Sequence, residues 1–210
     1  AFLGAGIFSD MFLIAFKLPN LFRRITAEGA FTSAFLPIYS KLKIQNGNDF
    51  AFIYFKKVLY RVATFLFIIM IIFQITMPFV IQFLAPGFMN NVEVINQITT
   101  LSRITIIFMP IISIVALLGV ATNVSGKFWV LAFTPIILNL SLILGCFFIN
   151  EYWTIKSLPL AFATVIGGVF QFFFIIIMIK KFKIFHYKNL ENQSEIKKEN
   201  KKFKFELNQT

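Results

Sequence analysis

The sequence is poor in the residues on which most enzyme chemistry depends. Its 210 residues include one cysteine, Cys146, and one histidine, His186. A single cysteine excludes a disulfide framework and a Cys-based zinc site, and a single histidine leaves little room for His-centred catalysis. No Walker loop, HExxH or GxSxG motif is present, so neither an ATPase nor a hydrolase is indicated. We therefore expect no enzyme activity, no cofactor and no metal site.

Charge is also scarce, and this argues against a soluble fold. Charged residues make up 14% of the chain and hydrophobic residues 58%, with thirty Phe, whereas an average soluble domain carries about 25% charge. A soluble protein of this composition would expose much of its apolar surface. The net charge of +11 lies at the ends of apolar runs and in residues 180–210, which hold nine Lys and four Glu. This distribution indicates a lipid bilayer as partner and no nucleic acid.

Long apolar runs predict membrane-spanning helices, each of which needs about 20 residues. Four charge-free stretches qualify: 62–92, 104–126, 128–150 and 157–179. The motif APGF at 85–88 ends the first of these helices near Leu84. Residues 9–41 are apolar overall but carry charges, and we interpret them as a further helix bent near Pro19 or Gly29. The fold class is therefore all-α: a polytopic membrane helix bundle within residues 1–183, with a polar tail at 184–210 and five spans at about 9–41, 60–84, 103–124, 128–149 and 158–180.

Loop charges predict the orientation of this bundle. One set of loops is rich in Lys and Arg: Lys41, Lys43, Lys56, Lys57, Arg61, Lys127, Lys180, Lys181, Lys183 and Lys188. The other set holds Glu93, Glu151, Lys156 and at most Arg103. The excess of basic residues in cytoplasmic loops places the first set, and the C-terminal tail, in the cytoplasm. Because the chain opens without Met and ends in a polar stretch, we interpret it as an internal fragment of a longer protein.

Ionisable residues within the first span are candidates for function. On a helical wheel, Asp10, Lys17, Arg24 and Glu28 fall within about 40° of one another, and Arg23 points roughly 100° away from Arg24. Such residues are costly in a membrane helix and usually face a bundle interior or an aqueous cavity. The alternative is an Arg pair that snorkels to the membrane surface, with Glu28 as its structural partner one turn on.

Uncharged polar residues and glycines within the spans have a structural interpretation. We expect Asn123, Asn139 and Gln171 to form interhelical hydrogen bonds rather than ligand contacts. Gly167 and Gly168 permit close packing of helices.

One long motif resembles a known family. The run SDMFLIAFKLPNLFRRITAEGAFTSAFLPIYSK at 9–41 is similar to the signature of the MurJ/MviN family of lipid II flippases. Three later segments agree with that family in order: APGF at 85–88, FTPIILNLS at 133–141 and GGVFQ at 167–171. The resemblance extends over nearly the whole chain, to about Lys183.

The resemblance implies a fold and a function. It implies a protein of fourteen transmembrane helices in two lobes, of which this chain supplies helices two to six of a truncated N-terminal lobe. The implied function is to move undecaprenyl-diphosphate-linked peptidoglycan precursor, lipid II, from the inner to the outer leaflet of the bacterial cytoplasmic (inner) membrane by alternating access. It implies no oligomeric state.

The resemblance also implies roles for four residues of the first span. Arg23 and Arg24 are substrate-binding residues, with Arg23 facing the cavity, while Asp10 and Glu28 serve gating or charge coupling, Asp10 near the outer gate. Because the helical wheel favours Arg24 instead, we suppose that Arg24 pairs with Glu28 and leaves Arg23 unpaired for phosphate.

Three other functions remain to be weighed. A related flippase or exporter of other oligosaccharide-lipids or small molecules should lack the 9–41 motif. A membrane-embedded prenyl-diphosphate enzyme would need a carboxylate cluster for Mg²⁺ or a usable His, which the sequence does not supply. A purely structural membrane anchor leaves the intramembrane charges unexplained.

Overall fold

The computed structural model describes residues 6–28, 30–149 and 152–185, with residues 27, 28 and 30–32 described by their backbone alone. Within that part of the chain every regular element is a helix, so the predicted all-α class is confirmed. The α-helices are α1 (Ile7–Arg23), α2 (Ala30–Leu84), α3 (Val92–Thr105), α4 (Phe108–Val124), α5 (Phe128–Phe147) and α6 (Leu158–Lys181). A π-helix, η1 (Arg24–Glu28), follows α1, and a 3₁₀ turn, η2 (Pro86–Phe88), follows α2.

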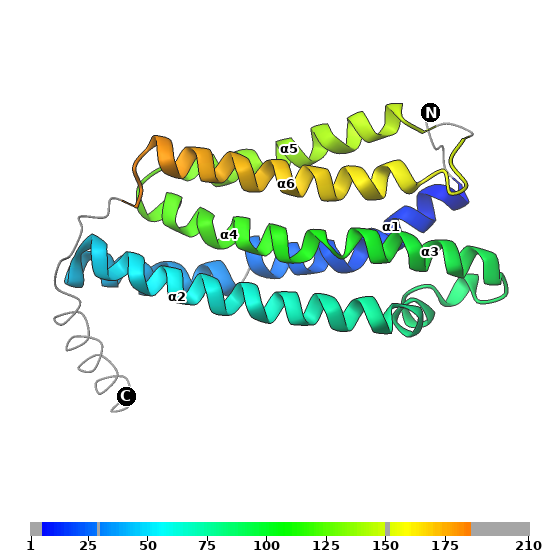
Figure 1. The fold of residues 1–210 in the computed structure, drawn as a ribbon, viewed down its shortest axis with the longest axis horizontal. Coiled ribbons are helices and arrows are strands. Elements are labelled where there is room, and N and C mark those ends of the chain that lie inside the picture. The colour runs from blue at the N-terminus through cyan, green and yellow to red at the C-terminus, as the bar shows by residue number, and fades with distance from the viewer. Residues whose placement is uncertain (1–5, 29, 150–151, 186–210) are drawn as a thin grey trace.

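The helices lie alongside one another as an elongated bundle (Figure 1). α1 and the first part of α2 run toward one end, where α2 turns back at Gly47, and α3 and α4 follow each other along the bundle. Gly47 has φ 81° and ψ 173°, a conformation that is essentially restricted to glycine. In the described part of the chain, the segments long and apolar enough to cross a membrane are Ser33–Leu84, Val92–Val124, Phe128–Phe147 and Leu158–Lys181. The chain is thus a multi-pass membrane protein.

The first predicted span, 9–41, is not one continuous helix. α1 passes through Pro19 without a break and ends at Arg23, where the π-helix begins. Pro19 leaves the carbonyl of Ala15 without its helical donor, and the Thr105 hydroxyl supplies one at 2.7 Å. The helix therefore continues through Pro19, because a neighbouring helix satisfies the freed carbonyl. The hydrogen-bond pattern changes from α-helical to π-helical at 24–28. This segment lies next to Gly29, which itself lies outside the described residues.

Two other prolines are accommodated in a similar way. Pro135 has no N–H for the carbonyl of Leu131, and the Thr134 hydroxyl donates to that oxygen at 2.9 Å. Pro110 has no N–H for the carbonyl of Ile106, and the Met109 N–H donates to that oxygen at 3.0 Å. The turn between α3 and α4 falls just before Pro110, because the regular hydrogen-bond pattern is interrupted there.

The helices extend beyond the predicted spans. The second part of α2 begins directly after Gly47 rather than near residue 60, and α3 begins at Val92 rather than near 103. The bundle also continues past residue 183: Ile184 is buried, and the Phe185 ring lies 4.8 Å from that of Phe52. The predicted boundaries mark the apolar portions of longer helices.

α4 forms the core of the bundle. It contacts α1, α2, α5 and α6, and most of its side chains from Phe108 to Thr122 are buried. The absence of a side chain at Gly168 allows close packing, since a Cβ there would lie 2.6 Å from the Phe108 ring. In contrast, α2 leaves large apolar side chains such as Ile75 and Phe83 exposed, at 71% and 87%. Such a surface is suited to contact with lipid.

Candidate functional site

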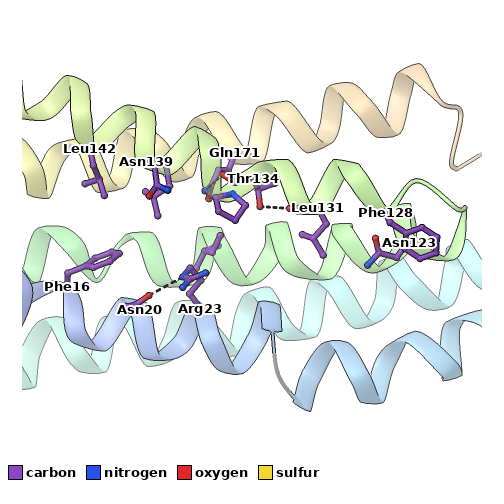
Figure 2. Close-up of a pocket in the computed structure, with 14 residues that line it drawn as sticks. Phe16, Asn20, Arg23, Asn123, Phe128, Leu131, Thr134, Asn139, Leu142 and Gln171 are labelled. Carbon is purple, nitrogen blue, oxygen red and sulfur yellow. Dashed lines mark hydrogen bonds between the residues drawn. The ribbon is translucent and has the colours of Figure 1, made fainter.

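A cavity of about 480 Å³ lies between α1, α4, α5 and α6. α1 lines it with Phe16, Asn20 and Arg23, whose spacing places them on one face of the helix. Figure 2 shows Asn20 and Arg23 rising from α1 toward the wall that carries Thr134, Asn139 and Gln171. Of the described residues that line the cavity, Arg23 alone is charged.

The Arg23 side chain is half-buried and hydrogen-bonded. Its Nε donates to the Asn20 Oδ1 at 3.0 Å. Arg23 is therefore held by a neutral amide side chain. The physical reason is the i, i+3 spacing on α1, which brings the two side chains together. Because the bond engages Nε, it fixes the plane of the guanidinium at the cavity wall.

Amide side chains from the opposite wall also reach the cavity. Gln171 Nε2 donates to the main-chain oxygen of Thr134 at 2.7 Å, which confirms the predicted interhelical hydrogen bond for this residue. A main-chain oxygen only accepts, so this contact fixes which end of the amide is nitrogen. Within the described structure, Gln171 Oε1 and Asn123 Oδ1 are buried acceptors without a hydrogen-bond partner. The cavity thus combines one cation with buried polar groups.

Arg24 faces a different hollow. It is exposed, and it lines a space of about 320 Å³ together with Lys17 and Leu21. Lys17 and Arg24 share a face of α1, as the helical wheel predicts, and neither lines the cavity that Arg23 lines. The two hollows adjoin, since Phe16 and Asn20 line both. The two adjacent arginines differ in surroundings because successive residues of a helix point about 100° apart.

The two predicted carboxylates lie elsewhere. Asp10 is exposed in the first turn of α1 and does not line the cavity. Thirteen residues separate it from Arg23, or about 20 Å along a helix. Glu28 ends the π-helix, and its side chain, with the predicted Arg24–Glu28 pair, lies outside the described residues.

Sequence reasoning missed several features around Arg23. The role of Asn20 could have been read from its i, i+3 spacing to Arg23. No sequence signal foretold the π-helix, a feature frequently found at functional sites. Its Thr26 hydroxyl donates to the carbonyl of Phe22 at 2.7 Å, and the Ser113 hydroxyl of α4 lies 3.3 Å from that hydroxyl. These contacts tie the end of α1 to the core helix.

Comparison with known proteins gives a consistent result. The family model described as lipid II flippase MurJ matches residues 1–208. A probable lipid II flippase MurJ of Rickettsia prowazekii is 37% identical over 85% of this chain and 35% of its own length. The lipid II flippase MurJ of Burkholderia cenocepacia is 31% identical over 80% of this chain. A solved structure of lipid II flippase MurJ in an inward closed conformation superposes with a TM-score of 0.68, at 25% identity, over 94% of this chain.

The chain spans only part of these relatives. It covers 35% of the Rickettsia prowazekii protein and 41% of the solved chain. The match nevertheless extends over almost all of its own residues, and it includes both arginines and the cavity-lining helices. This chain belongs to the MurJ family of lipid II flippases.

Proposed function

We propose that this chain is part of a flippase that moves lipid II from the inner to the outer leaflet of the bacterial cytoplasmic membrane. Family membership supports this proposal, and the observation that carries it is Arg23 in a cavity lined by four helices. Arg23 ends a helix of 17 residues, so it lies about 25 Å from the start of α1, deep within the bundle. A flippase changes the position of its substrate and none of its covalent bonds, so no catalytic residue is required.

The chemistry of the cavity suits a diphosphate. A guanidinium offers planar paired donors that match phosphate oxygens, and it stays charged at any relevant pH. Asn20 accepts a hydrogen bond from Nε, and this contact orients the guanidinium at the cavity wall. In this proposal Arg23 contacts the diphosphate, and the prenyl chain stays in the bilayer. Arg24 forms a second contact from the adjoining hollow, which shares Phe16 and Asn20 with the cavity. Rocking of two lobes about this site would then expose it to each side in turn.

The same proposal includes the orientation of the bundle in the membrane and the roles of Asp10 and Glu28. The end of the bundle that holds the Gly47 turn carries Lys41, Lys43 and Lys127, and Lys43 Nζ donates to Ser125 Oγ at 3.1 Å. We place that end, with the C-terminal tail, in the cytoplasm. Asp10 then lies near the outer surface, where it serves gating, and Glu28 serves charge coupling.

Growth of a flippase-depleted bacterial strain tests the role of Arg23 in the full-length protein. Arg23→Ala should abolish growth while the protein remains inserted and abundant. A lost charge-assisted hydrogen bond of about 2–3 kcal/mol corresponds to roughly a 30- to 140-fold loss of affinity. Arg23→Lys should restore little, because an ammonium loses the planar fork. Normal growth of Arg23→Ala at normal abundance would contradict the proposal.

Arg24 offers a neighbouring comparison. Arg24→Ala should lower abundance by leaving Glu28 unpaired in the membrane, at a cost on the order of a few kcal/mol. Replacing Arg24 and Glu28 together should recover abundance better than Arg24→Ala alone. Immunoblotting of the membrane fraction measures this. If Arg24→Ala is inactive at full abundance while Arg23→Ala is active, the roles of the two arginines are reversed.

A further inference from the structure

A second polar hollow, which we call the α2–α3 groove, lies between α2 and α3 and has a volume of about 620 Å³. α2 lines it with Pro78 and Gln82, and α3 lines it with a stripe at one helical spacing: Asn96, Thr99, Thr100 and Arg103. The groove shares no lining residue with the Arg23 cavity. It is therefore a separate site on the bundle.

The groove reaches deep into the apolar layer. Gln74 Nε2 donates to the main-chain oxygen of Arg103 at 2.7 Å, so the two residues lie at the same level. Gln74 is twelve residues beyond Val62 and ten before Leu84 in a charge-free stretch, or about 18 Å and 15 Å from its ends. Because the hydrocarbon core is about 30 Å thick, the Arg103 backbone lies near its middle.

A cation at this depth needs a polar partner. Arginine near the centre of a membrane helix costs about 2.5–3.5 kcal/mol on insertion scales. The Arg103 side chain is exposed, and among the described residues no Asp or Glu lines the groove. Thr100, Thr99 and Asn96 lie progressively nearer the Val92 end of α3, so the guanidinium can extend along a polar path toward that membrane surface.

The surface beside the groove is suited to an acyl chain. Ile75, Phe79 and Phe83 follow one another at helical spacing on α2 and are 71%, 67% and 87% exposed. They adjoin the positions of Gln74, Pro78 and Gln82 that face α3. A polar groove with one cation thus borders an exposed apolar stripe, which matches the two parts of a lipid.

We propose that the α2–α3 groove binds a phospholipid from the leaflet at the Val92 end of the bundle. The phosphate contacts the Arg103 guanidinium and the amide donors of Asn96 and Gln82, with the bilayer locally thinned. The Thr99 and Thr100 hydroxyls donate to the carbonyls of Ile95 and Asn96 at 2.8 and 3.0 Å. Their lone pairs therefore remain to accept a hydroxyl or ammonium of the headgroup.

The binding test uses the purified full-length protein in a neutral glycoside detergent, titrated with short-chain phosphatidylglycerol. The midpoint of thermal unfolding should rise with lipid concentration and report an apparent affinity. Arg103→Gln should weaken this affinity at least about tenfold, and Arg103→Lys less. Gln74 bonds the main chain of residue 103, so both variants keep that contact. Asn96→Ala, with the charge intact, should weaken binding about threefold or more.

Lys156→Gln is the matched control, because it removes one positive charge at the same end of the bundle. It should leave the affinity within about twofold of wild type. The proposed site would be wrong if Lys156→Gln lost as much affinity for phosphatidylglycerol as Arg103→Gln. It would also be wrong if a neutral short-chain glycolipid raised the midpoint of thermal unfolding as much as phosphatidylglycerol does. If Arg103→Gln does not fold, an unchanged affinity of Asn96→Ala for phosphatidylglycerol would contradict the proposal instead. If only a short-chain prenyl diphosphate gives an Arg103-dependent rise, the groove holds the transported lipid and the phospholipid assignment is wrong.

Discussion

Several polar side chains in this bundle satisfy main-chain groups that prolines leave without a partner, or orient a charged side chain at the cavity wall. Asn20 orients Arg23, Thr134 replaces the donor that Pro135 lacks, and Thr105 does the same for Pro19. Each contact satisfies a polar group within the membrane-spanning part of the bundle. The threonine hydroxyls therefore stabilise the helices at the prolines, in addition to the packing of the apolar core.

Thr105→Val tests this view of the prolines. The change keeps the shape of the side chain but leaves the buried carbonyl of Ala15 without a donor, at a cost of about 1–3 kcal/mol. The midpoint of thermal unfolding in detergent should fall measurably. Thr100→Val is the control, since its exposed hydroxyl bonds only its own helix, to Asn96. Equal effects of the two substitutions would show that the contact to α1 has no special role.

Sequence reasoning located the arginines but not their surroundings. A helical wheel gives the angle of about 100° between Arg23 and Arg24, yet it does not say where the neighbouring helices lie. That depends on the packing of α4, α5 and α6, which no local pattern of α1 encodes. The family resemblance favoured Arg23 at the cavity, and the structure places it on that wall.

The helices themselves were largely foreseen, because long apolar runs dominate the sequence. What the apolar pattern missed were helical extensions into polar segments, such as residues 48–59 of α2. Those residues are helical because Phe50, Ala51 and Phe55 are buried against the bundle, which is a tertiary effect. The π-helix after Arg23 was missed for a related reason, since it rests on contacts with α4.

The turn within α2 depends on one glycine. Gly47→Ala should destabilise the folded chain by about 1–3 kcal/mol, because its φ and ψ are essentially closed to other residues. No atom lies within 4 Å of the added Cβ, so the effect is one of backbone strain alone. The free energy of unfolding in a denaturant titration measures it. Gly87→Ala, which also meets no neighbour and has no positive φ, should change little.

The arrangement of the whole bundle predicts its topology in the membrane. In the full-length protein with Cys146→Ser, an added cysteine at Asn91 should react with an impermeant maleimide in intact cells. An added cysteine at Asn48, next to the Gly47 turn, should react only after the cells are opened. The excess of Lys and Arg at the Gly47 end is the physical reason. Labelling at Asn48 together with protection at Asn91 would reverse the orientation.

Transport of lipid II by the full-length protein is the proposed activity. It is measured in intact cells as the fraction of labelled lipid II that an added, impermeant enzyme can cleave in the outer leaflet. Cells whose only flippase is this protein should expose lipid II, and cells with Arg23→Ala at equal abundance should expose about tenfold less or lower. Equal exposure in the two strains, or none with the unaltered protein correctly inserted, would contradict the proposed function.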